Sequence, residues 1–454
     1  MTASSFSLSA FTSHMETLQR QAEQALALCG YESLLISSGH AKTHFLDDTH
    51  YAFRTNPHFI RWVPFMHEAA DCWLWIRPST KPALYIHAPD DFWYQSTERP
   101  MEAWADLFDI ALLTDLQAFL SSVPASATAV IAEDRYESLA ETVGYNPEAL
   151  LHTLHFDRAV KTPWEIECVF QANCRAVKGH KAAELGFLAG ESERTLHGRY
   201  LQATEHLDHE LPYNVIMALN ENAATLHYQY KNAQPVAQSR TLLLDGGASY
   251  MGYAADITRT CSVPADRLPV EQQTAARVFS ELISRVDALQ LSIIERVKPG
   301  IEYVELHRLA HQYLIDELVV SGLLKARPSS SHTSEMISRT FFPHGLGHFL
   351  GIQTHDVGGW QQDRQGRIHP PPDAHPFLRL TRVLEEGMVL TVEPGLYFIP
   401  SLLAKLRDHP AASLVNWTLV EKLQPWGGIR VEDNIVITAK GARNLTREAF
   451  ALNA

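Results

Sequence analysis

The sequence predicts two domains, an α/β domain followed by a larger α+β domain with antiparallel strands. Three observations support this prediction. A chain of 454 residues is too long for a single hydrophobic core. About the first 155 residues alternate short apolar strands with helical stretches, whereas the remainder combines long helices with strands of alternating hydrophobicity. A hydrophobic share of 46% is that of a globular protein.

The first domain begins with an amphipathic pattern from about Ser13 to Cys29, and Gly30 predicts the end of that helix. Short apolar runs then predict four strands, at Ser33–Ile36, Cys72–Ile76, Ala83–Ile86 and Ala129–Ile131. This order of elements is typical of an α/β domain.

A helix start marks the junction between the domains. Thr162 is a suitable N-cap, Pro163 suits the first helical position, and Glu165 completes a capping box. The helix should run toward Gly186. We therefore expect domains at residues 1–158 and 159–454.

The second domain mixes both kinds of element. Helical patterns are expected at 193–208, 269–297 and 302–318. Half-buried antiparallel strands are expected at Thr241–Asp245, Tyr253–Val263, Met388–Glu393 and Ile429–Thr438. Ser329–Ser334 and the Pro-rich His369–Pro376 are expected to be loops, the latter crossing near the site.

Charge and cysteine content exclude several classes of function. The formal charge of -14 is spread along the chain with no basic cluster, so we expect no nucleic-acid partner. The five cysteines show no CxxC spacing and indicate a reducing compartment. No signal peptide or membrane span is evident, so a cytoplasmic location without membrane attachment is expected.

Two aspartates mark the first candidate site. In LLLDGGASYMGYAADITRT, an apolar strand ends at Asp245, and Asp256 follows eleven residues later across a Gly-rich hairpin. A carboxylate beside a buried strand needs a cation or several hydrogen-bond donors. Taken alone, either aspartate could be an ordinary turn residue.

Three histidines lie among small residues in FFPHGLGHFLGIQTHDVGG, namely His344, His348 and His355. Gly345 and Gly347 allow close backbone approach, and a neutral imidazole is a good ligand beside carboxylates. The alternative is that these are loop histidines without a metal.

Two glutamates, Glu393 in VLTVEPGLYF and Glu432 in GIRVEDNIVI, lie inside otherwise apolar strands. Each could belong to an isolated ion pair, and Arg430 would lie on the same strand face as Glu432. Taken together with the other candidates, however, they complete an oxygen-rich set that suits Mn, Co or Fe and is large enough for two bridged ions.

Such paired ions lower the pKa of a bridging water and polarise a scissile carbonyl. The chain contains no GxSxG, no HExxH and no paired Cys and His motif. A metal-dependent hydrolase is therefore favoured over serine, cysteine and zincin enzymes.

The ordered set DGG…D, PHGLGH…HDVGG, EPGLY and IRVEDN resembles the pita-bread metallopeptidases, and among them the bacterial Xaa-Pro dipeptidases, or prolidases. These motifs cover about Pro212–Ile437, the junction VKTPWEIE fits, and LDDTHYAFRTNPHF extends the likeness into the first domain. The resemblance implies a creatinase-like α/β N-terminal domain, for dimerisation and as an active-site lid. It implies that a pita-bread catalytic domain with a curved antiparallel sheet follows.

The resemblance also implies a division of labour at two divalent cations, Mn being most expected and Co, Fe or Zn possible. Asp245 would bind one ion and Asp256 and Glu432 would bridge both, while His348 and Glu393 would complete the coordination. Glu393 would also act as the general base.

Further residues match the family as catalytic or substrate-binding candidates. His355 would stabilise the tetrahedral intermediate, and His227 and His344 would meet the substrate's terminal carboxylate. Arg430 and Tyr397 are supporting candidates.

Two residues are candidates for specificity. Arg379 could bind the same carboxylate in bidentate geometry, with Arg382 as its competitor for this role. Tyr213 could line the pocket for proline.

The resemblance implies hydrolysis of Xaa-Pro dipeptides by a metal-bridging hydroxide, with organophosphate ester hydrolysis as a side activity. An aminopeptidase P acting on longer peptides is the alternative within the fold. A non-catalytic pita-bread binding protein and a metal-free creatinase-like enzyme are disfavoured because all five ligand types are present. A homodimer is expected, in which Asp47 or Asp48 could reach the partner's site.

Overall fold

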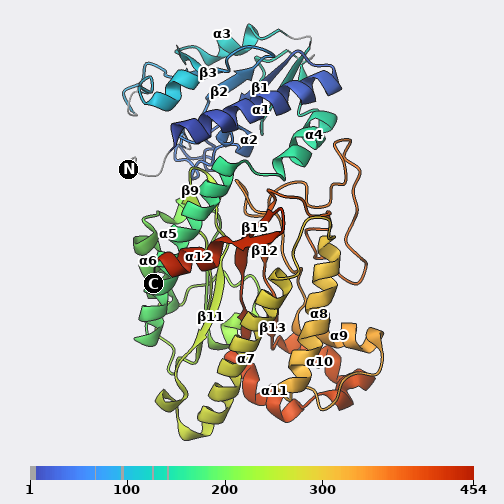
Figure 1. Cartoon of the computed structure of the whole chain (residues 1–454). Coiled ribbons are helices and arrows are strands. Elements are labelled where there is room, and N and C mark those ends of the chain that lie inside the picture. Colours follow the sequence, from blue (N-terminus) through green and yellow to red (C-terminus); the bar gives the residue numbers. More distant parts are fainter. Residues whose placement is uncertain (1–6, 67, 94–96, 125–126, 141–142, 454) are drawn as a thin grey trace. The chain divides into compact units, whose positions relative to one another are not determined.

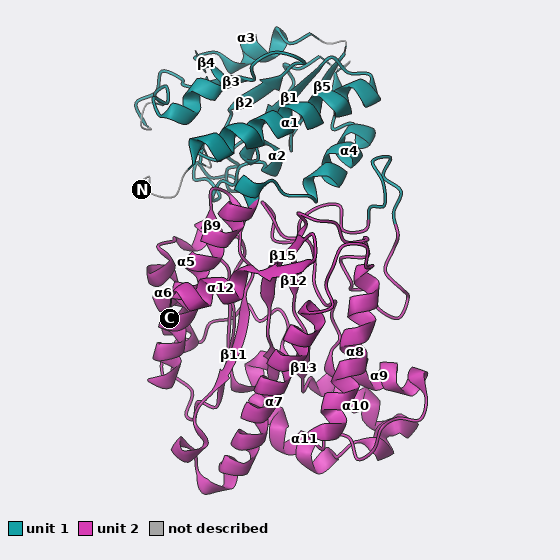
Figure 2. Ribbon diagram, in the orientation of Figure 1, with its two compact units in different colours: residues 1–165, 361–368 teal, residues 166–360, 369–454 magenta. Residues whose placement is uncertain are grey.

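A computed structural model describes residues 7–66, 68–93, 97–124, 127–140 and 143–453. The chain forms two compact units (Figure 2). Unit 1 comprises Met1–Glu165 with Gln361–Ile368, and unit 2 comprises Ile166–Trp360 with His369–Ala454. The expected domain boundary lay between residues 158 and 159, whereas unit 1 extends to Glu165. The expectation also placed residues 361–368 in the second domain. The dimerisation and lid roles of the first domain stay predictions.

Unit 1 is an α/β unit built on one mixed six-stranded sheet, in the order β4-β3-β2-β1-β5-β6. The strands are β1 Ser33–Ser37, β2 Trp73–Ile76, β3 Ala83–His87, β4 Asp109–Leu113, β5 Thr128–Ile131 and β6 Gly144–Tyr145. The helices are α1 Leu8–Cys29, α2 Pro57–Ile60, α3 Leu116–Ser121 and α4 Glu148–Arg158 (Figure 1). The strand β4 was not expected from the sequence.

Local signals set the ends of α1. Ser7 accepts a hydrogen bond from the backbone of Ala10, and Gly30 adopts a left-handed conformation with φ of 75°. All residues of β1 are buried, because both faces of this central strand are covered. The helix and strand therefore form as the apolar pattern predicts.

The capping box at the junction is confirmed. The backbone N–H of Thr162 donates to Glu165 Oε2 at 2.8 Å, and the N–H of Glu165 donates to Thr162 Oγ1 at 3.3 Å. The helix that follows is α5, Pro163–Leu188. The other α-helices of unit 2 are α6 Glu193–Thr204, α7 Val270–Ile294, α8 Tyr303–Val320, α9 Ser331–Phe341, α10 Pro400–Arg407, α11 Trp417–Leu423 and α12 Leu445–Leu452.

Unit 2 is an α+β unit whose strand pairs are all antiparallel, which confirms the expected fold class. Its sheets have the orders β10-β9, β11-β8-β7, β12-β15-β16 and β13-β14. An isolated bridge joins Thr258 of the β11-β8-β7 sheet to Glu432, which lies between the strands Gly428–Arg430 and Asp433–Thr438. Helix α7 packs against β11 and β14, and α12 packs against β15.

The strands of unit 2 are β7 Ile216–Leu219, β8 Thr241–Asp245, β9 Ser249–Tyr250, β10 Tyr253–Ala254, β11 Thr258–Ser262, β12 Val389–Val392, β13 Gly395–Tyr397, β14 Gly428–Arg430, β15 Asp433–Thr438 and β16 Gly441–Asn444. Two expected long strands are therefore each split in two. The prediction that Asp256, Glu393 and Glu432 lie inside strands was wrong, because each lies in a break or just after a strand end.

The breaks have a physical cause, since the backbone pairs elsewhere. The N–H of Asp256 donates to the Asn434 side chain, and the N–H of Glu393 donates to Leu346. With these hydrogen bonds the backbone at Asp256 and Glu393 leaves the regular strand pairing. Their side chains therefore need not alternate in direction as they would within a strand.

The expected loop Ser329–Ser334 was partly wrong. Helix α9 starts at Ser331, because the side chain of Ser330 accepts from the N–H of Thr333 and caps the helix. The expected loop His369–Pro376 contains no helix or strand.

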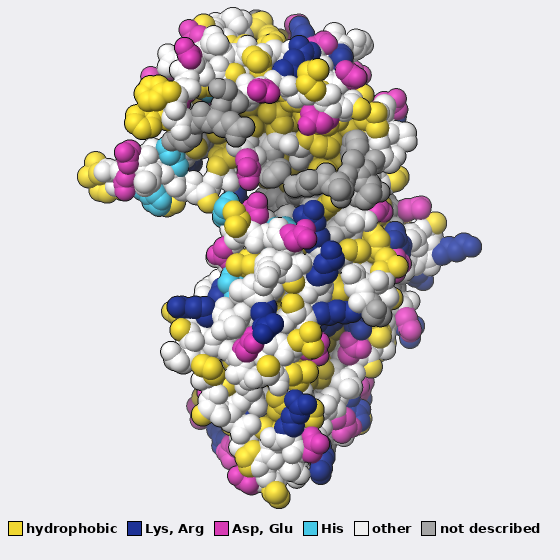
Figure 3. Space-filling model, turned by 90° about the vertical axis from the view of Figure 1, so that its left-hand side faces the viewer, with side chains coloured by type: hydrophobic (Ala, Val, Ile, Leu, Met, Phe, Trp, Pro, Cys, Tyr) yellow, Lys and Arg dark blue, Asp and Glu magenta, His cyan; other side chains and the backbone are white. Residues whose placement is uncertain are grey.

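On the face shown in Figure 3, basic and acidic side chains are interspersed over unit 2, in line with the lack of a basic run in the sequence. In the described part of the chain, no helix is both long and apolar enough to span a membrane.

Candidate metal centre

Strand register brings three of the predicted ligands together in unit 2. Thr258 pairs with Asp245 across β11 and β8, and it bridges to Glu432 on its other side. Residues directly opposite each other in antiparallel strands point to the same face. Asp245 and Glu432 therefore flank Thr258, and Glu393 follows Val392, the partner of Asp433.

Asp256 reaches the same space from the break between β10 and β11. The Asn434 side chain holds its backbone, accepting from the Asp256 N–H at 3.0 Å and donating to the Asp256 carbonyl. A Cβ at Gly247 would clash with the Ala255 carbonyl, so this glycine allows the two aspartate-bearing segments to approach.

The orientation of His348 is the most informative feature of the site. Its Nδ1 lies 2.9 Å from the Phe349 carbonyl, which accepts and so requires a proton on Nδ1. The buried Nε2 then faces Asp256 Oδ2 at 3.4 Å, Glu393 Oε1 at 3.6 Å and Glu432 Oε1 at 4.0 Å. Burial acts to lower the pKa of His348, but hydrogen bonding to Asp256 and the charges of Asp256 and Glu393 outweigh it, and the pKa is raised. The ring can therefore pair with these carboxylates as a cation, or, when neutral, direct the lone pair of Nε2 at a metal ion held between them.

Tyr213 also faces too many acceptors for its single proton. Its hydroxyl oxygen is 2.8 Å from Asp245 Oδ1 and 2.6 Å from Asp256 Oδ1. Only one of these contacts can use the hydroxyl proton. Its hydroxyl thus positions two carboxylates, while the expected role of its ring in a proline pocket stays a prediction.

The carboxylates have strongly perturbed acidities. Burial, with the charges of Asp256 and Asp245, raises the pKa of Glu393 to about 7, against the opposing effect of His348 and Arg430. Burial followed by the neighbouring carboxylates raises the pKa of Glu432 well above its ordinary value. Like charges packed in a space of low dielectric resist ionisation in this way.

Other groups act on the two aspartates. Burial is the largest effect on Asp245 and raises its pKa, with Arg430 opposing. Burial also acts to raise the pKa of Asp256, but hydrogen bonding and charge from His348 outweigh it, and the pKa is lowered.

The donor set fits divalent cations. Among the described residues, Glu432 Oε1 is buried and has no hydrogen-bond partner. A buried carboxylate oxygen without a donor is costly unless it binds a cation. Asp256, His348 and Glu432 each offer an atom within 4.8 Å of the others, and Asp245 and Glu393 border the same group.

Arg430 connects the centre to its surroundings. It donates from Nη2 to Asp245 Oδ2 at 2.6 Å, from Nη1 to the Tyr397 hydroxyl at 2.9 Å, and from Nε to Thr258 Oγ1 at 3.0 Å. Thr258 in turn donates to Glu432 Oε2 at 2.8 Å. The alternative of an Arg430–Glu432 ion pair is therefore wrong, because the guanidinium reaches Glu432 only through Thr258.

His344 and Tyr397 extend this network. His344 Nδ1 lies 2.8 Å from the Gly345 carbonyl, so Nε2 accepts from the Tyr397 hydroxyl at 2.8 Å. His344 Nδ1 is also 3.6 Å from Glu393 Oε2. Burial lowers the pKa of His344 to about 3, with Arg430 adding to the effect, so the ring is neutral near pH 7.

The remaining candidates lie at the edge of the centre. The His355 ring packs edge-on against His348 at 4.5 Å, and burial, with charge from His348, Arg379 and His227, lowers the pKa of His355 to about 4. His355 itself, like Arg379 and His227, is exposed, so it lies at the rim of the centre and its ring is only partly withdrawn from water. Arg382 is buried and pairs with Glu385 at 2.9 Å, which leaves Arg379 as the arginine of the two that acts on His355.

The sequence reasoning missed Thr258 and Asn434. Asn434 lies inside the quoted IRVEDN motif, where an amide before an apolar run could have been noticed as a backbone clamp. Thr258 carries no comparable signal, because its role depends on strand register.

Residues 167–439 match the model of metallopeptidase family M24. The chain belongs to metallopeptidase family M24. Residues 9–156 of this M24 member match the N-terminal domain of Xaa-Pro dipeptidase. These matches confirm the resemblance drawn from the motifs.

Curated relatives cover nearly the whole chain. An Xaa-Pro dipeptidase of Pseudoalteromonas atlantica is 41% identical over 442 residues, covering 96% of this chain and 98% of the relative. An Xaa-Pro dipeptidase of Marinobacter nauticus is 42% identical over 435 residues, covering 96% and 97%.

Solved structures agree in fold. Proline aminopeptidase P II from Yersinia pestis has a TM-score of 0.67 at 25% identity, covering 97% of this M24 chain and 100% of that one. Aminopeptidase P from E. coli in a low-pH form has a TM-score of 0.69 at 25% identity, covering 96% and 98%.

Proposed function

We propose that this M24 protein is a metal-dependent Xaa-Pro dipeptidase. The observation that carries the proposal is the meeting of His348 Nε2 with three carboxylates, two of them buried, an arrangement that favours a bound cation. Relatives named Xaa-Pro dipeptidase that match over 96% of the chain support the substrate class.

The metal ligands would be Asp245, Asp256, His348, Glu393 and Glu432. Bound at this oxygen-rich set, two divalent cations would supply an activated water and polarise the substrate carbonyl. One imidazole among four carboxylates suits Mn²⁺, with Co, Fe or Zn as other candidates.

The chain's own groups would handle the proton and the developing charge. Glu393, whose pKa lies at about 7 without metal, can accept a proton from the attacking water and deliver it to the imide nitrogen. His355 is neutral near pH 7 because its pKa is lowered, and its N–H can donate to the carbonyl oxygen as negative charge develops.

His227 and Arg379 would bind the substrate's terminal carboxylate, and His344 would take part only if its Nε2 gave up the Tyr397 hydroxyl. Charge from His227 helps to lower the pKa of His344, and charge from Arg379 and His227 helps to lower that of His355, so these groups lie near one another. A cationic guanidinium that recognises a free C-terminus would restrict the enzyme to dipeptides.

The decisive experiment measures hydrolysis of Ala-Pro and Ala-Pro-Ala by the same preparation, before and after chelation and Mn²⁺ readdition. We expect Ala-Pro to be cleaved and Ala-Pro-Ala to be spared, with activity lost on chelation and restored by Mn²⁺. Preferential cleavage of Ala-Pro-Ala would instead identify an aminopeptidase P, and full activity after chelation would refute the metal mechanism.

A homodimer through unit 1 is part of the proposal. Large apolar side chains are exposed there, namely Phe45, Leu46, Phe92, Trp93 and Met101, and Figure 3 shows hydrophobic side chains on this unit's visible face. Exposed apolar side chains of this size are typical of interaction surfaces. Asp47 and Asp48 in the same segment are exposed and are the candidates to reach a partner.

Analytical ultracentrifugation tests this arrangement. A Phe92→Ser/Trp93→Ser variant should sediment as a monomer, whereas Leu452→Ser, at an exposed position of unit 2, should remain dimeric.

The described cysteines are all free, which is consistent with the proposed cytoplasmic location.

A further inference from the structure

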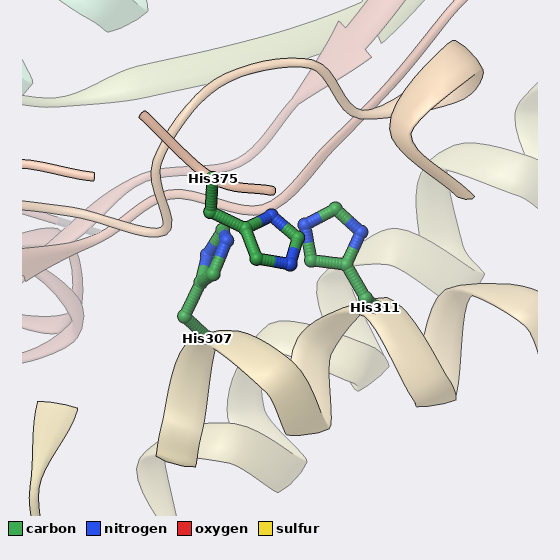
Figure 4. A group of neighbouring side chains, drawn as sticks. All are labelled: His307, His311 and His375. Atoms are coloured by element: carbon green, nitrogen blue, oxygen red, sulfur yellow. The ribbon is translucent and has the colours of Figure 1, made fainter. Parts of the chain in front are cut away.

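A second group of potential metal ligands lies in unit 2, away from the five proposed ligands. It consists of His307, His311 and His375, each offering one nitrogen within 4.8 Å of the others. His307 and His311 are four residues apart on α8, so they project from the same helix face, and His375 comes from the Pro-rich segment. Figure 4 shows the three rings converging. All three residues are buried.

Hydrogen bonding orients His311 as a ligand. Ser338 donates its hydroxyl proton to the Glu335 carbonyl at 3.0 Å, so its oxygen accepts from His311 Nδ1 at 2.9 Å. The lone pair of His311 is therefore on Nε2, which is buried without a hydrogen-bond partner among the described residues. A neighbour that fixes the tautomer of a histidine is a recurring feature of metal sites.

His375 has a similar arrangement. Its Nε2 lies 3.2 Å from Glu335 Oε1, and a nitrogen that faces a carboxylate carries the proton. The lone pair of the neutral ring is then on Nδ1. Glu335 is partly exposed, so it can also turn toward an ion as a further ligand.

Packing alone does not explain why a histidine is buried at position 307. In the part of the chain that the structure describes, neither of its ring nitrogens has a hydrogen-bond partner, although the residue is fully buried. A phenylalanine would fill this space without leaving a buried hydrogen-bond donor and acceptor unpaired. Burial, together with the neighbouring histidines, lowers the pKa of His307 well below its ordinary value, which keeps the imidazole neutral as a ligand must be.

The group is separate from the centre described above. The Phe342 ring stacks on His311 at 4.9 Å and lies 6.1 Å from the His307 ring, and it also packs edge-on against His344 at 4.7 Å. An aromatic ring thus lies between the histidine group and the carboxylate network.

We propose that His307, His311 and His375 form a second metal site, for one divalent transition ion that prefers imidazole, such as Zn²⁺. Three imidazoles with a carboxylate or water as fourth ligand are a common zinc set. With Zn–N bonds of about 2.0–2.1 Å, the nitrogens of a tetrahedral site lie roughly 3.3 Å apart, so binding draws the rings together. The ion would tie the Pro-rich segment that precedes Arg379 to α8.

The first test counts bound Zn²⁺ per chain by equilibrium dialysis and elemental analysis. We expect the wild type to bind one more Zn²⁺ than a His307→Gln/His311→Gln variant, whose side chains remain polar and of similar size. His332→Gln, at an exposed position of the neighbouring helix α9, is the matched control and should bind as the wild type does. Because the result is a difference, it does not depend on how many ions the carboxylate centre holds.

The second test uses the wild type alone, in case the double variant fails to fold. Crystals equilibrated with Zn²⁺ should show an anomalous peak at the zinc edge among the three imidazoles. Equal stoichiometry in the wild type and a folded double variant would overturn the proposal. So would the lack of a peak at this position in crystals whose carboxylate centre is occupied.

Discussion

Arg430 Nη2 donates to Asp245 Oδ2 across 2.6 Å, between residues 185 positions apart in the chain. Arg430 is buried, and the same guanidinium also holds Tyr397 and Thr258. One cationic side chain therefore sets the positions of a proposed metal ligand and of the network that leads to His344.

Arg430→Lys should lower both Mn²⁺ affinity and kcat/KM. An ammonium group cannot make the three directed hydrogen bonds of the planar guanidinium, and loss of such a supporting partner typically costs roughly 10–100-fold. Metal titration and Ala-Pro kinetics measure the two effects. Arg407→Lys, in the exposed pair with Glu421, serves as control and should change neither. Unchanged metal affinity in the Arg430 variant would contradict the role assigned to this residue.

Glu432→Gln should abolish turnover without destabilising the metal-free protein. The substitution removes one of several crowded, buried carboxylates, so the apo form loses like-charge repulsion while the holo form loses a ligand. Differential scanning calorimetry should show that Mn²⁺ raises Tm in the wild type but has little effect on the variant. The control is Glu421→Gln at the surface, where the metal response should persist. A full Mn²⁺ response in the Glu432 variant would exclude it as a ligand.

In the metal-free protein, the stability that Glu393 contributes should be lost as pH rises from about 5 to 8, while histidines with lowered pKa values, such as His344 and His355, act in the opposite direction below pH 6.5. Burial raises the pKa of Glu393 from an ordinary 4.5 to about 7, so the folded state binds its proton more tightly than the unfolded state does. That contribution is complete below the unfolded pKa and disappears as pH passes the folded one. One proton changes the unfolding free energy by at most about 1.4 kcal/mol per pH unit.

Urea unfolding in the presence of a chelator measures this slope. Over this range the wild type should lose stability relative to Glu393→Gln, whereas its difference from Glu421→Gln should stay constant. Because the metal competes with the proton, Mn²⁺ affinity should rise over the same pH range. A slope identical in the wild type and the Glu393 variant would show that this group does not titrate as described.

His355→Ala should lower kcat by roughly 10²–10³ with little change in KM, if the imidazole donates to the developing oxyanion. Steady-state kinetics with Ala-Pro separates the two parameters. His332→Ala, at an exposed position remote in sequence, provides the comparison. A rise in KM alone would assign His355 to substrate binding.

Arg379→Met should raise KM for Ala-Pro by roughly 10–100-fold, since a charged hydrogen bond contributes about 1.5–3 kcal/mol. The amide of Ala-Pro lacks the terminal carboxylate, so its hydrolysis should be insensitive to the substitution. Arg407→Met controls for loss of a surface charge. Equal effects on Ala-Pro and on its amide would mean that Arg379 does not bind the terminal carboxylate.

Much of the site could be predicted from the sequence because carboxylates and histidines in apolar or glycine-rich surroundings are costly without a partner. That reasoning identified Asp245, Asp256, His348, Glu393 and Glu432 as one set, and the structure brings them together. The capping box at Thr162 was predictable for a related reason, since it depends on residues only three positions apart.

The sequence by itself determined the family, the two kinds of domain and the candidate ligands, because each follows from local pattern and residue chemistry. Only the tertiary structure decided the partners: Arg430 binds Asp245 rather than Glu432, and strands break where Asp256 and Glu432 lie. It also brought His375 to His307 and His311. Such pairings depend on strand register and on contacts between distant segments. Hydrophobic periodicity along the chain carries no information about either.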